Sequence, residues 1–338
     1  MNAIVLNKPG ELSCIIKPHP GIPAAGEVLL RIRQLGVCGT DLHAFKGNQP
    51  FFSYPRILGH EIAAEVMEVG SDIMHVKCGD RCTVMPYRNT IIDQAVKRGK
   101  TNCADGLSVM GVHEDGAMQE FILCDGNLVF PANDLTLDQL AVIEPMAIGC
   151  HAIDRAEIKP DDIVLVVGAG PIGIAVITIG LLKSSRMGVI DTNQSRLDFV
   201  RNKFPEVETL MANDHVIEEV KRLLGGDLPT IVLDATGNRE SMLKCFDYVA
   251  HGGTVVYVGL FTGDITFSDP DFHRKEITLK SSRNAVAGDF KKIISYLQNG
   301  TLNLDGYITH RLQFDTLTEN FTRLYQPAEN VIKAVIEF

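Results

Sequence analysis

The sequence lacks the opening pattern of a secreted protein. Its first residues, MNAIVLNKPGEL, contain no charged segment followed by an apolar run and a small-residue cleavage site. The 8 cysteines are scattered along 338 residues instead of forming a dense framework. Reduced thiols fit this usage best, so we expect a cytoplasmic protein.

Dense basic runs and uninterrupted membrane spans are also absent. The formal net charge is -10 and the sequence pI is about 5.5, so the surface would repel a phosphate backbone, and we expect no nucleic-acid partner. The apolar stretch 163–182 is interrupted by Gly168, Gly170, Pro171 and Gly173. A strand, a glycine turn and a buried helix explain this stretch better than a membrane helix, so we expect no membrane association.

What the chain does contain is enough apolar material, 45% of its residues, for two domains. Residues 1–150 show short strand patterns such as EVLLRIRQLGV and EIAAEVMEVG, separated by turn residues. From about residue 162, strands alternate with apolar helices, which predicts a doubly wound parallel sheet. We therefore predict an α/β and β fold, with one domain of residues 1–150 and 285–338 and a second of residues 151–284.

A dinucleotide-binding motif occurs in IVLVVGAGPIG, where Gly168, Gly170 and Gly173 follow a β-branched run and precede an apolar helix. The first glycine permits a tight turn, the second admits a pyrophosphate, and the third allows the helix to pack closely on the strand. The free N–H groups at the start of the helix favour an anion.

The choice of dinucleotide depends on Asp191, which ends the next apolar strand 18 residues after Gly173. Its carboxylate can accept hydrogen bonds from the adenosine ribose and would repel a 2′-phosphate. We therefore predict NAD as the cofactor. Arg196 is the alternative signal, because an arginine near that pocket can hold a phosphate, although it is more often a surface or adenine-stacking residue.

Potential zinc ligands lie in GVCGTDLH, in GHE and in IEPMAIGCHA. Cys38, His60 and Glu144 supply a thiolate, an imidazole and a carboxylate, a mixed set suited to zinc with one coordination position left open. Glu61 is a second candidate carboxylate. It directly follows His60 and should point away from it in an extended segment, so both carboxylates remain open.

The chain resembles the zinc-dependent medium-chain alcohol dehydrogenases, in the branch of sorbitol and threonine dehydrogenases. The resemblance is carried, in order, by GVCGTDLH, LGHE, EP…HA, VGAGPIG, DATG and VGL. The resemblance runs from Gly26 to Phe338. It implies a GroES-like β-barrel catalytic domain, a Rossmann NAD-binding domain, a catalytic zinc at Cys38, His60 and Glu61 or Glu144, and a homo-oligomer, either dimer or tetramer. It implies further NAD contacts from Pro171, Ile172, Thr236, Val258, Gly259, Ser282 and Arg283.

The sequence departs from this family where four cysteines spaced C-x2-C-x2-C-x7-C normally bind a structural zinc. The matching positions are Thr90, Asp93, Val96 and Ala104, and Cys103 lies one place away. A single thiol cannot build a tetrahedral site, so we predict one catalytic zinc per chain and no structural zinc.

The resemblance also implies a mechanism. A hydroxyl bound to zinc loses its proton readily, and the resulting alkoxide transfers hydride to the nicotinamide. Thr40 then accepts the proton, the nicotinamide ribose relays it, and His43 passes it to solvent. Local turn hydrogen bonding by CGTD is the alternative role of these two residues.

The chain also resembles bacterial dehydrogenases of hexonic sugar acids, in the segments GNQPFFSYPRILGHE, GVHEDGAMQEF and SSRNA. Those enzymes oxidise C5 and convert L-gulonate to D-fructuronate or L-galactonate to D-tagaturonate. An anionic substrate needs a local cation in a chain of charge -10, and Arg283 can bind a carboxylate through two parallel hydrogen bonds. Pairing of Arg283 with a cofactor phosphate or a structural carboxylate is the alternative.

Two other functions remain open at this point. One is the oxidation of a neutral polyol, a sugar phosphate or threonine, which would use the same zinc and NAD. The other is a catalytically silent protein that senses NAD or a metabolite. Every position needed for zinc and hydride chemistry is filled, which favours an enzyme.

Overall fold

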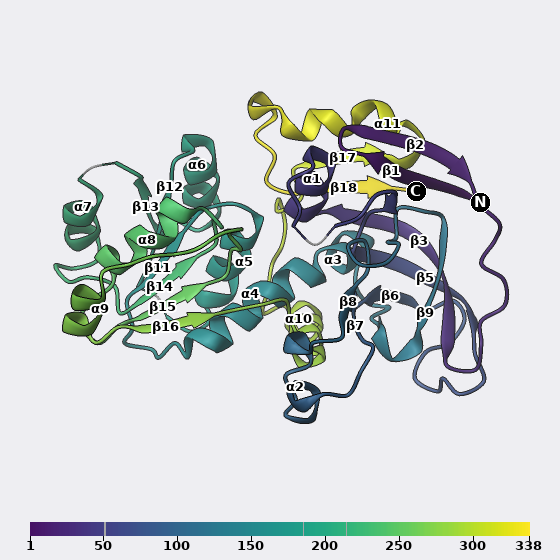
Figure 1. The fold of residues 1–338 in the computed structure, drawn as a ribbon, viewed down its shortest axis with the longest axis horizontal. Helices are drawn as coiled ribbons and strands as arrows, with labels where there is room; N and C mark the ends of the chain where they lie inside the picture. Colours follow the sequence, from purple (N-terminus) through teal and green to yellow (C-terminus); the bar gives the residue numbers. More distant parts are fainter. Residues whose placement is uncertain (51, 185, 214) are drawn as a thin grey trace. The chain divides into compact units, whose positions relative to one another are not determined.

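The computed structural model describes residues 1–50, 52–184, 186–213 and 215–338, and the chain divides into two units (Figure 1). The first unit contains Met1–Glu144 and Val286–Phe338, and the second contains Pro145–Ala285. The C-terminal strands of the first unit, yellow in Figure 1, therefore join N-terminal strands drawn in purple.

The first unit is built on β-sheets whose apolar residues form its core. Leu30, Ile32, Leu35 and Ile62 are at most 1% exposed. A three-stranded sheet has the order β2-β1-β4, with strands β1 (Asn2–Lys8), β2 (Glu11–Ile16) and β4 (Arg56–Ile57). A seven-stranded sheet has the order β10-β6-β5-β3-β18-β17, with β9 also paired to β3, and contains β3 (Glu27–Val37), β5 (Glu61–Val69), β6 (Arg81–Val84), β9 (Phe121–Asp125), β10 (Val129–Pro131), β17 (His310–Gln313) and β18 (Ala334–Glu337).

The end of strand β3 lies between two partners that are far away in the sequence. On one side, Gly36 is opposite Glu61 of β5. On the other side, Gly36 is opposite Val335 of β18, and Val37 is opposite Ala334. The sheet register thus brings the residues around 37, 61 and 334 together before any side-chain contact is considered.

Most helices of the first unit are short. The helices are α1 (Gly39–Lys46), α2 (Gln94–Lys97), α3 (Leu137–Ala141), α10 (Ala287–Gln298) and α11 (Leu317–Asn320), with 3-10 turns η1 (Thr101–Cys103), η2 (Gly126–Leu128), η3 (Phe314–Thr316), η4 (Phe321–Tyr325) and η5 (Pro327–Glu329). Helix α4 (Ile143–Ala156) begins in the first unit and continues into the second.

The second unit contains a parallel six-stranded sheet of order β13-β12-β11-β14-β15-β16. Its strands are β11 (Val164–Val167), β12 (Met187–Asp191), β13 (Glu208–Met211), β14 (Ile231–Asp234), β15 (Thr254–Tyr257) and β16 (Thr278–Ser281). Its helices are α5 (Pro171–Gly180), α6 (Gln194–Lys203), α7 (Val216–Leu223), α8 (Arg239–Tyr248) and α9 (Asp269–Lys275). The doubly wound parallel sheet that the sequence predicts is confirmed, with its topological switch between β11 and β14.

The apolar stretch 163–182 contains strand β11, the glycine turn and helix α5. Across the described residues, we find no helix whose length and apolar character would let it cross a bilayer. The strand and helix are instead part of the second unit, where Leu165 and Val167 belong to its main hydrophobic cluster.

A small lobe in the first unit lies between strands β7 (Tyr87–Asn89) and β8 (Leu107–Val109) and contains α2 and η1. Asp93 fastens two of its segments together. One carboxylate oxygen caps α2 by accepting the Val96 N–H at 2.9 Å, and the other accepts the Asp105 N–H at 2.8 Å. These backbone bonds lower the pKa of Asp93. Beside them, the Thr90 hydroxyl donates to the Gly106 carbonyl at 2.8 Å.

Replacing Asp93 with Asn should loosen this lobe, because an amide offers one acceptor oxygen where the carboxylate offers two. We expect trypsin to cleave at Lys97, Arg98 and Lys100 about three- to tenfold faster in the native variant. Asp105→Asn is the matched control, since Asp105 contributes its backbone N–H to the same bond. Equal cleavage rates for both variants and the unmodified protein would contradict this account of the lobe.

Candidate metal and dinucleotide sites

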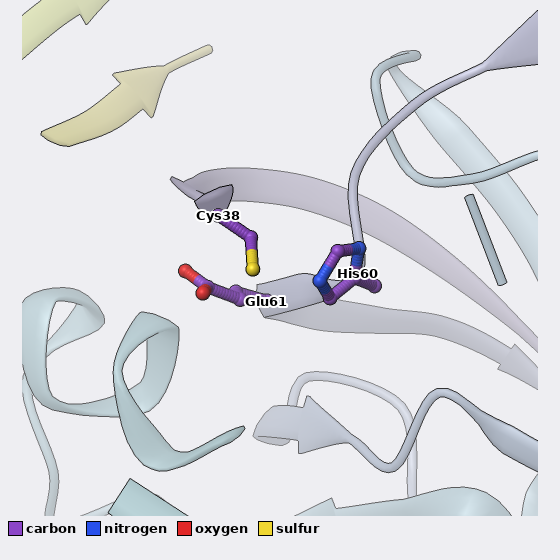
Figure 2. Close-up of side chains that lie close together, drawn as sticks. All are labelled: Cys38, His60 and Glu61. Atoms are coloured by element: carbon purple, nitrogen blue, oxygen red, sulfur yellow. The ribbon is translucent and has the colours of Figure 1, made fainter. Parts of the chain in front are cut away.

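Cys38, His60 and Glu61 form a cluster in the first unit, and each offers one ligand atom within 4.8 Å of the other two. Cys38 follows β3 and caps the start of α1, while His60 immediately precedes Glu61, the first residue of β5. Figure 2 shows the Cys38 sulfur directed between the His60 ring and the Glu61 carboxylate. His60 is 5% exposed and Glu61 is 1% exposed.

The sequence argument that adjacent residues point to opposite faces does not describe His60 and Glu61. Strand β5 begins only at Glu61, and Gly59 before it has a φ of 95°, a left-handed conformation suited to glycine. The pleat therefore does not include His60, and both side chains contribute to the same cluster.

Asp41 connects the two segments that carry Cys38 and His60. Its carboxylate accepts the Cys38 N–H at 3.0 Å and the Gly59 N–H at 3.3 Å, and lies 3.9 Å from Nδ1 of His60. Burial acts to lower the pKa of His60, but Cys38, Asp41 and Glu144 outweigh it and hold that pKa well above 6.5. The imidazole therefore lies in a strongly anionic environment.

Glu61 is held by Lys333, which precedes strand β18. Both residues are 1% exposed and form an ion pair, and the Lys333 ammonium also donates to the Val37 carbonyl at 3.0 Å. A methyl group at Gly36 would overlap the Glu61 carboxylate, so glycine is required there. One buried cation thus neutralises Glu61 and ties it to the backbone that precedes Cys38.

Glu144, the other predicted carboxylate, is 2% exposed and does not fall within the 4.8 Å cluster formed by the described residues. The Tyr87 hydroxyl donates a hydrogen bond to its Oε1. Burial raises the pKa of Glu144 to about 7, and the nearby His60 partly offsets that rise. Both glutamates remain candidate ligands.

The residues present fit a zinc ion. Among the described residues, Nδ1 of His60 and Oε2 of Glu144 are buried polar atoms without a hydrogen-bond partner. An isolated buried carboxylate oxygen is costly unless a proton or a cation satisfies it. A thiol, an imidazole and two carboxylates are together the donor set that zinc accepts, so the site suits a single divalent cation.

Thr40 and His43 lie on helix α1, not on an extended segment. Thr40 is half-buried and its N–H donates to the Cys38 sulfur at 3.5 Å, whereas His43 is exposed. Residues three apart on a helix share a face, so Thr40 and His43 lie on the same side of α1.

The glycine turn of the second unit has the geometry expected of a dinucleotide loop. Gly168 has a φ of 99°, a Cβ on Gly173 would overlap the Gly168 carbonyl oxygen, and Gly170 caps helix α5. Asp191 accepts the Ala169 N–H at 2.6 Å and the Asn193 N–H at 2.7 Å. Its carboxylate therefore lies directly beside the loop that would hold the phosphates.

Arg196 pairs with Asp191 at 3.8 Å and is partly exposed. The remaining predicted NAD contacts all follow strand ends at the carboxyl edge of the sheet or begin α5. Thr236 follows β14, where the buried Asp234 accepts its N–H and its hydroxyl. The others are Pro171 and Ile172 at the start of α5, Val258 and Gly259 after β15, and Ser282 and the exposed Arg283 after β16.

Comparison with known proteins identifies the family. Residues 24–134 match the alcohol dehydrogenase GroES-like domain, and residues 171–299 match the zinc-binding dehydrogenase family. The chain is 40% identical to the L-galactonate-5-dehydrogenase of Escherichia coli K12 over 338 residues, which cover 100% of this chain and 99% of that protein. The chain belongs to the zinc-dependent medium-chain alcohol dehydrogenase family.

Two further relatives support the membership of this chain in the zinc-dependent medium-chain family. Sorbitol dehydrogenase of Ovis aries is 31% identical over 94% of this chain and 92% of its own length. The NADH complex of the alcohol dehydrogenase RspB from Escherichia coli CFT073 has a TM-score of 0.92 at 25% identity and covers 100% of this chain and 99% of that chain.

These matches confirm the predicted GroES-like and Rossmann fold and the prediction of an oxidoreductase acting on CH–OH groups. They also support zinc and a nicotinamide dinucleotide as cofactors. The sequence did not predict Asp41, Lys333 and Tyr87 as parts of the candidate zinc site. Lys333 had a signal, a lone cation in the apolar run VIKAVIEF, whereas nothing in the sequence distinguished Tyr87 from a core aromatic.

In metal-free protein, Glu144→Gln should become more stable than the unmodified chain as the pH rises. The pKa of Glu144 is about 7 in the folded state against 4.5 for an ordinary glutamate. The stability that this proton supplies is complete below the unfolded pKa and is lost as the pH rises through the folded pKa. We expect denaturant unfolding to show a shift of up to about 3 kcal/mol in the variant's favour between about pH 4 and pH 8.

The exposed Glu68→Gln variant provides the comparison for this measurement. A difference between Glu144→Gln and the unmodified chain that stays constant over this pH range would show that Glu144 does not titrate as its burial requires.

Proposed function

We propose that this chain is an NAD-dependent dehydrogenase of hexonic sugar acids, which oxidises the C5 hydroxyl of L-gulonate to give D-fructuronate or of L-galactonate to give D-tagaturonate. The observation that carries this proposal is the 40% identity to L-galactonate-5-dehydrogenase over the whole chain. The cluster of Cys38, His60 and Glu61 agrees with this proposal, because these residues form a zinc-compatible donor set.

One zinc ion would be held by Cys38 and His60, with Glu61 or Glu144 as the carboxylate. When bound, zinc would supply a Lewis acid that lowers the pKa of the substrate hydroxyl, and the nicotinamide would supply the hydride acceptor. The absence of cysteine at residues 90, 93, 96 and 104 supports a single zinc per chain. The family's usual assembly into dimers or tetramers is the oligomeric state we propose.

Residues of the chain transfer the proton and bind the charged group of the substrate. The half-buried Thr40 hydroxyl accepts the proton that leaves the substrate hydroxyl and gives up its own to the nicotinamide ribose, from which the exposed His43 imidazole passes a proton to water. Asp41 keeps the segment of Thr40 fixed by capping α1. Arg283 binds the carboxylate of the substrate, since a guanidinium matches a carboxylate with two parallel hydrogen bonds.

The cofactor is NAD because Asp191 places a carboxylate beside the loop that holds the phosphates. We expect kcat/KM with NAD to exceed that with NADP by about 100-fold or more, since a like charge in this position costs several kcal/mol. Asp191→Asn should lower the NAD-to-NADP ratio of kcat/KM by about tenfold, whereas Asp198→Asn, a partly exposed position on α6, should leave this ratio unchanged. A clear preference of the unmodified enzyme for NADP would refute the assignment.

Turnover on L-gulonate and L-galactonate, measured beside sorbitol, galactitol phosphate and threonine, tests the substrate class. Arg283→Ala should lose about 2 to 5 kcal/mol of transition-state stabilisation for the acid and much less for a neutral polyol. Arg274→Ala, which removes an exposed arginine paired with Asp271, is the control. Equal losses on acid and polyol would discard Arg283 as the carboxylate-binding residue.

A further inference from the structure

Tyr87 makes a contact that neither the sequence motifs nor the proposed reaction requires. It begins strand β7, is 5% exposed, and donates its hydroxyl proton to Oε1 of Glu144, the second residue of helix α4, which is 2% exposed. Both side chains belong to the first unit. The bond therefore joins a β-ribbon to a helix start in the interior, where little water competes for either partner.

The Tyr87 ring is held in place by other aromatic residues. It meets Phe290 of α10 edge to face, with ring centroids 6.4 Å apart and an interplanar angle of 81°. Phe290 is fully buried and stacks on Phe130 of β10 with centroids 5.5 Å apart. Because close packing restricts the ring, it also restricts the positions of the hydroxyl and of the carboxylate oxygen that the hydroxyl binds.

The two glutamates near the zinc-compatible cluster are consequently held in different ways. Glu61 is paired with the Lys333 ammonium, which cancels its charge. Glu144 receives a neutral hydroxyl donor on Oε1, and its buried Oε2 has no hydrogen-bond partner among the described residues. A neutral donor orients a carboxylate without supplying a positive charge, so Oε2 of Glu144 is left to bind a cation.

We propose that Tyr87 is a positioning residue of the metal site, which fixes Glu144 through Oε1 and thereby directs Oε2 to the zinc ion. This inference rests on the proposed function, because it assumes that zinc occupies the site of Cys38 and His60. Tyr87 touches neither zinc nor substrate and acts through Glu144.

The test is the zinc affinity of Tyr87→Phe, measured by competition with a chromophoric chelator. Phe keeps the ring packing and removes the hydroxyl, so we expect zinc to bind about 10- to 100-fold more weakly, the usual effect of losing a partner of a metal ligand. Tyr257→Phe is the matched control, because it also removes a hydroxyl bonded to a protein oxygen, the Met242 carbonyl at 2.8 Å, but lies in the second unit. Its zinc affinity should stay within about twofold of the unmodified enzyme.

A double-mutant cycle with Glu144→Ala separates positioning from a general loss of structure. If Tyr87 acts through Glu144, adding Tyr87→Phe to Glu144→Ala should change the zinc affinity no further. The visible spectrum of the cobalt-substituted enzyme should shift in Tyr87→Phe and remain unchanged in Tyr257→Phe, since it reports the ligand arrangement directly.

The possible results separate this inference from the proposed function. An unmodified enzyme that binds no zinc at Cys38 and His60 defeats the proposed function and this inference with it. An unmodified enzyme that binds zinc, together with a Tyr87→Phe variant of equal affinity and equal cobalt spectrum, overturns the role of Tyr87 alone. A loss of affinity that persists in the Glu144→Ala background also overturns it.

Discussion

Acidic groups buried together are the constraint on which the first unit depends. Asp41, Glu61 and Glu144 are each at most 2% exposed and lie near the Cys38 thiol and the His60 imidazole. Lys333 supplies one compensating charge. Buried anions are costly unless a cation or hydrogen bonds satisfy them, so this arrangement favours the folded state most when a divalent cation completes it. A metal ion bound by these residues would therefore also stabilise the fold of this unit.

The fold satisfies this constraint by gathering short segments from the whole length of the unit. The end of β3 has β5 on one side and β18 on the other, so the sheet register alone places Cys38, Glu61 and Lys333 near one another. Asp41 then joins the backbone before His60 to that of Cys38. The lobe between β7 and β8 is held differently, because the Asp93 carboxylate accepts hydrogen bonds from backbone N–H groups of two of its segments.

Local motifs could be predicted from the sequence, whereas contacts between distant segments could not. The glycine turn at Gly168 and the carboxylate of Asp191 follow directly from a strand, a turn and a helix in succession, and the structure places them side by side. The position of Glu61 could not be predicted from strand alternation, because the left-handed Gly59 keeps His60 outside the pleat. Tyr87 required the partner Glu144, which lies 57 residues away in sequence.

We propose that a single zinc ion is bound by Cys38 and His60, with a carboxylate beside them. Anomalous diffraction at the zinc edge, from crystals of protein purified without chelators, tests it most directly. We expect one peak per chain, at roughly 2.3 Å from the Cys38 sulfur and roughly 2.1 Å from a ring nitrogen of His60. A peak in the lobe between β7 and β8, or none beside Cys38 and His60, would contradict it.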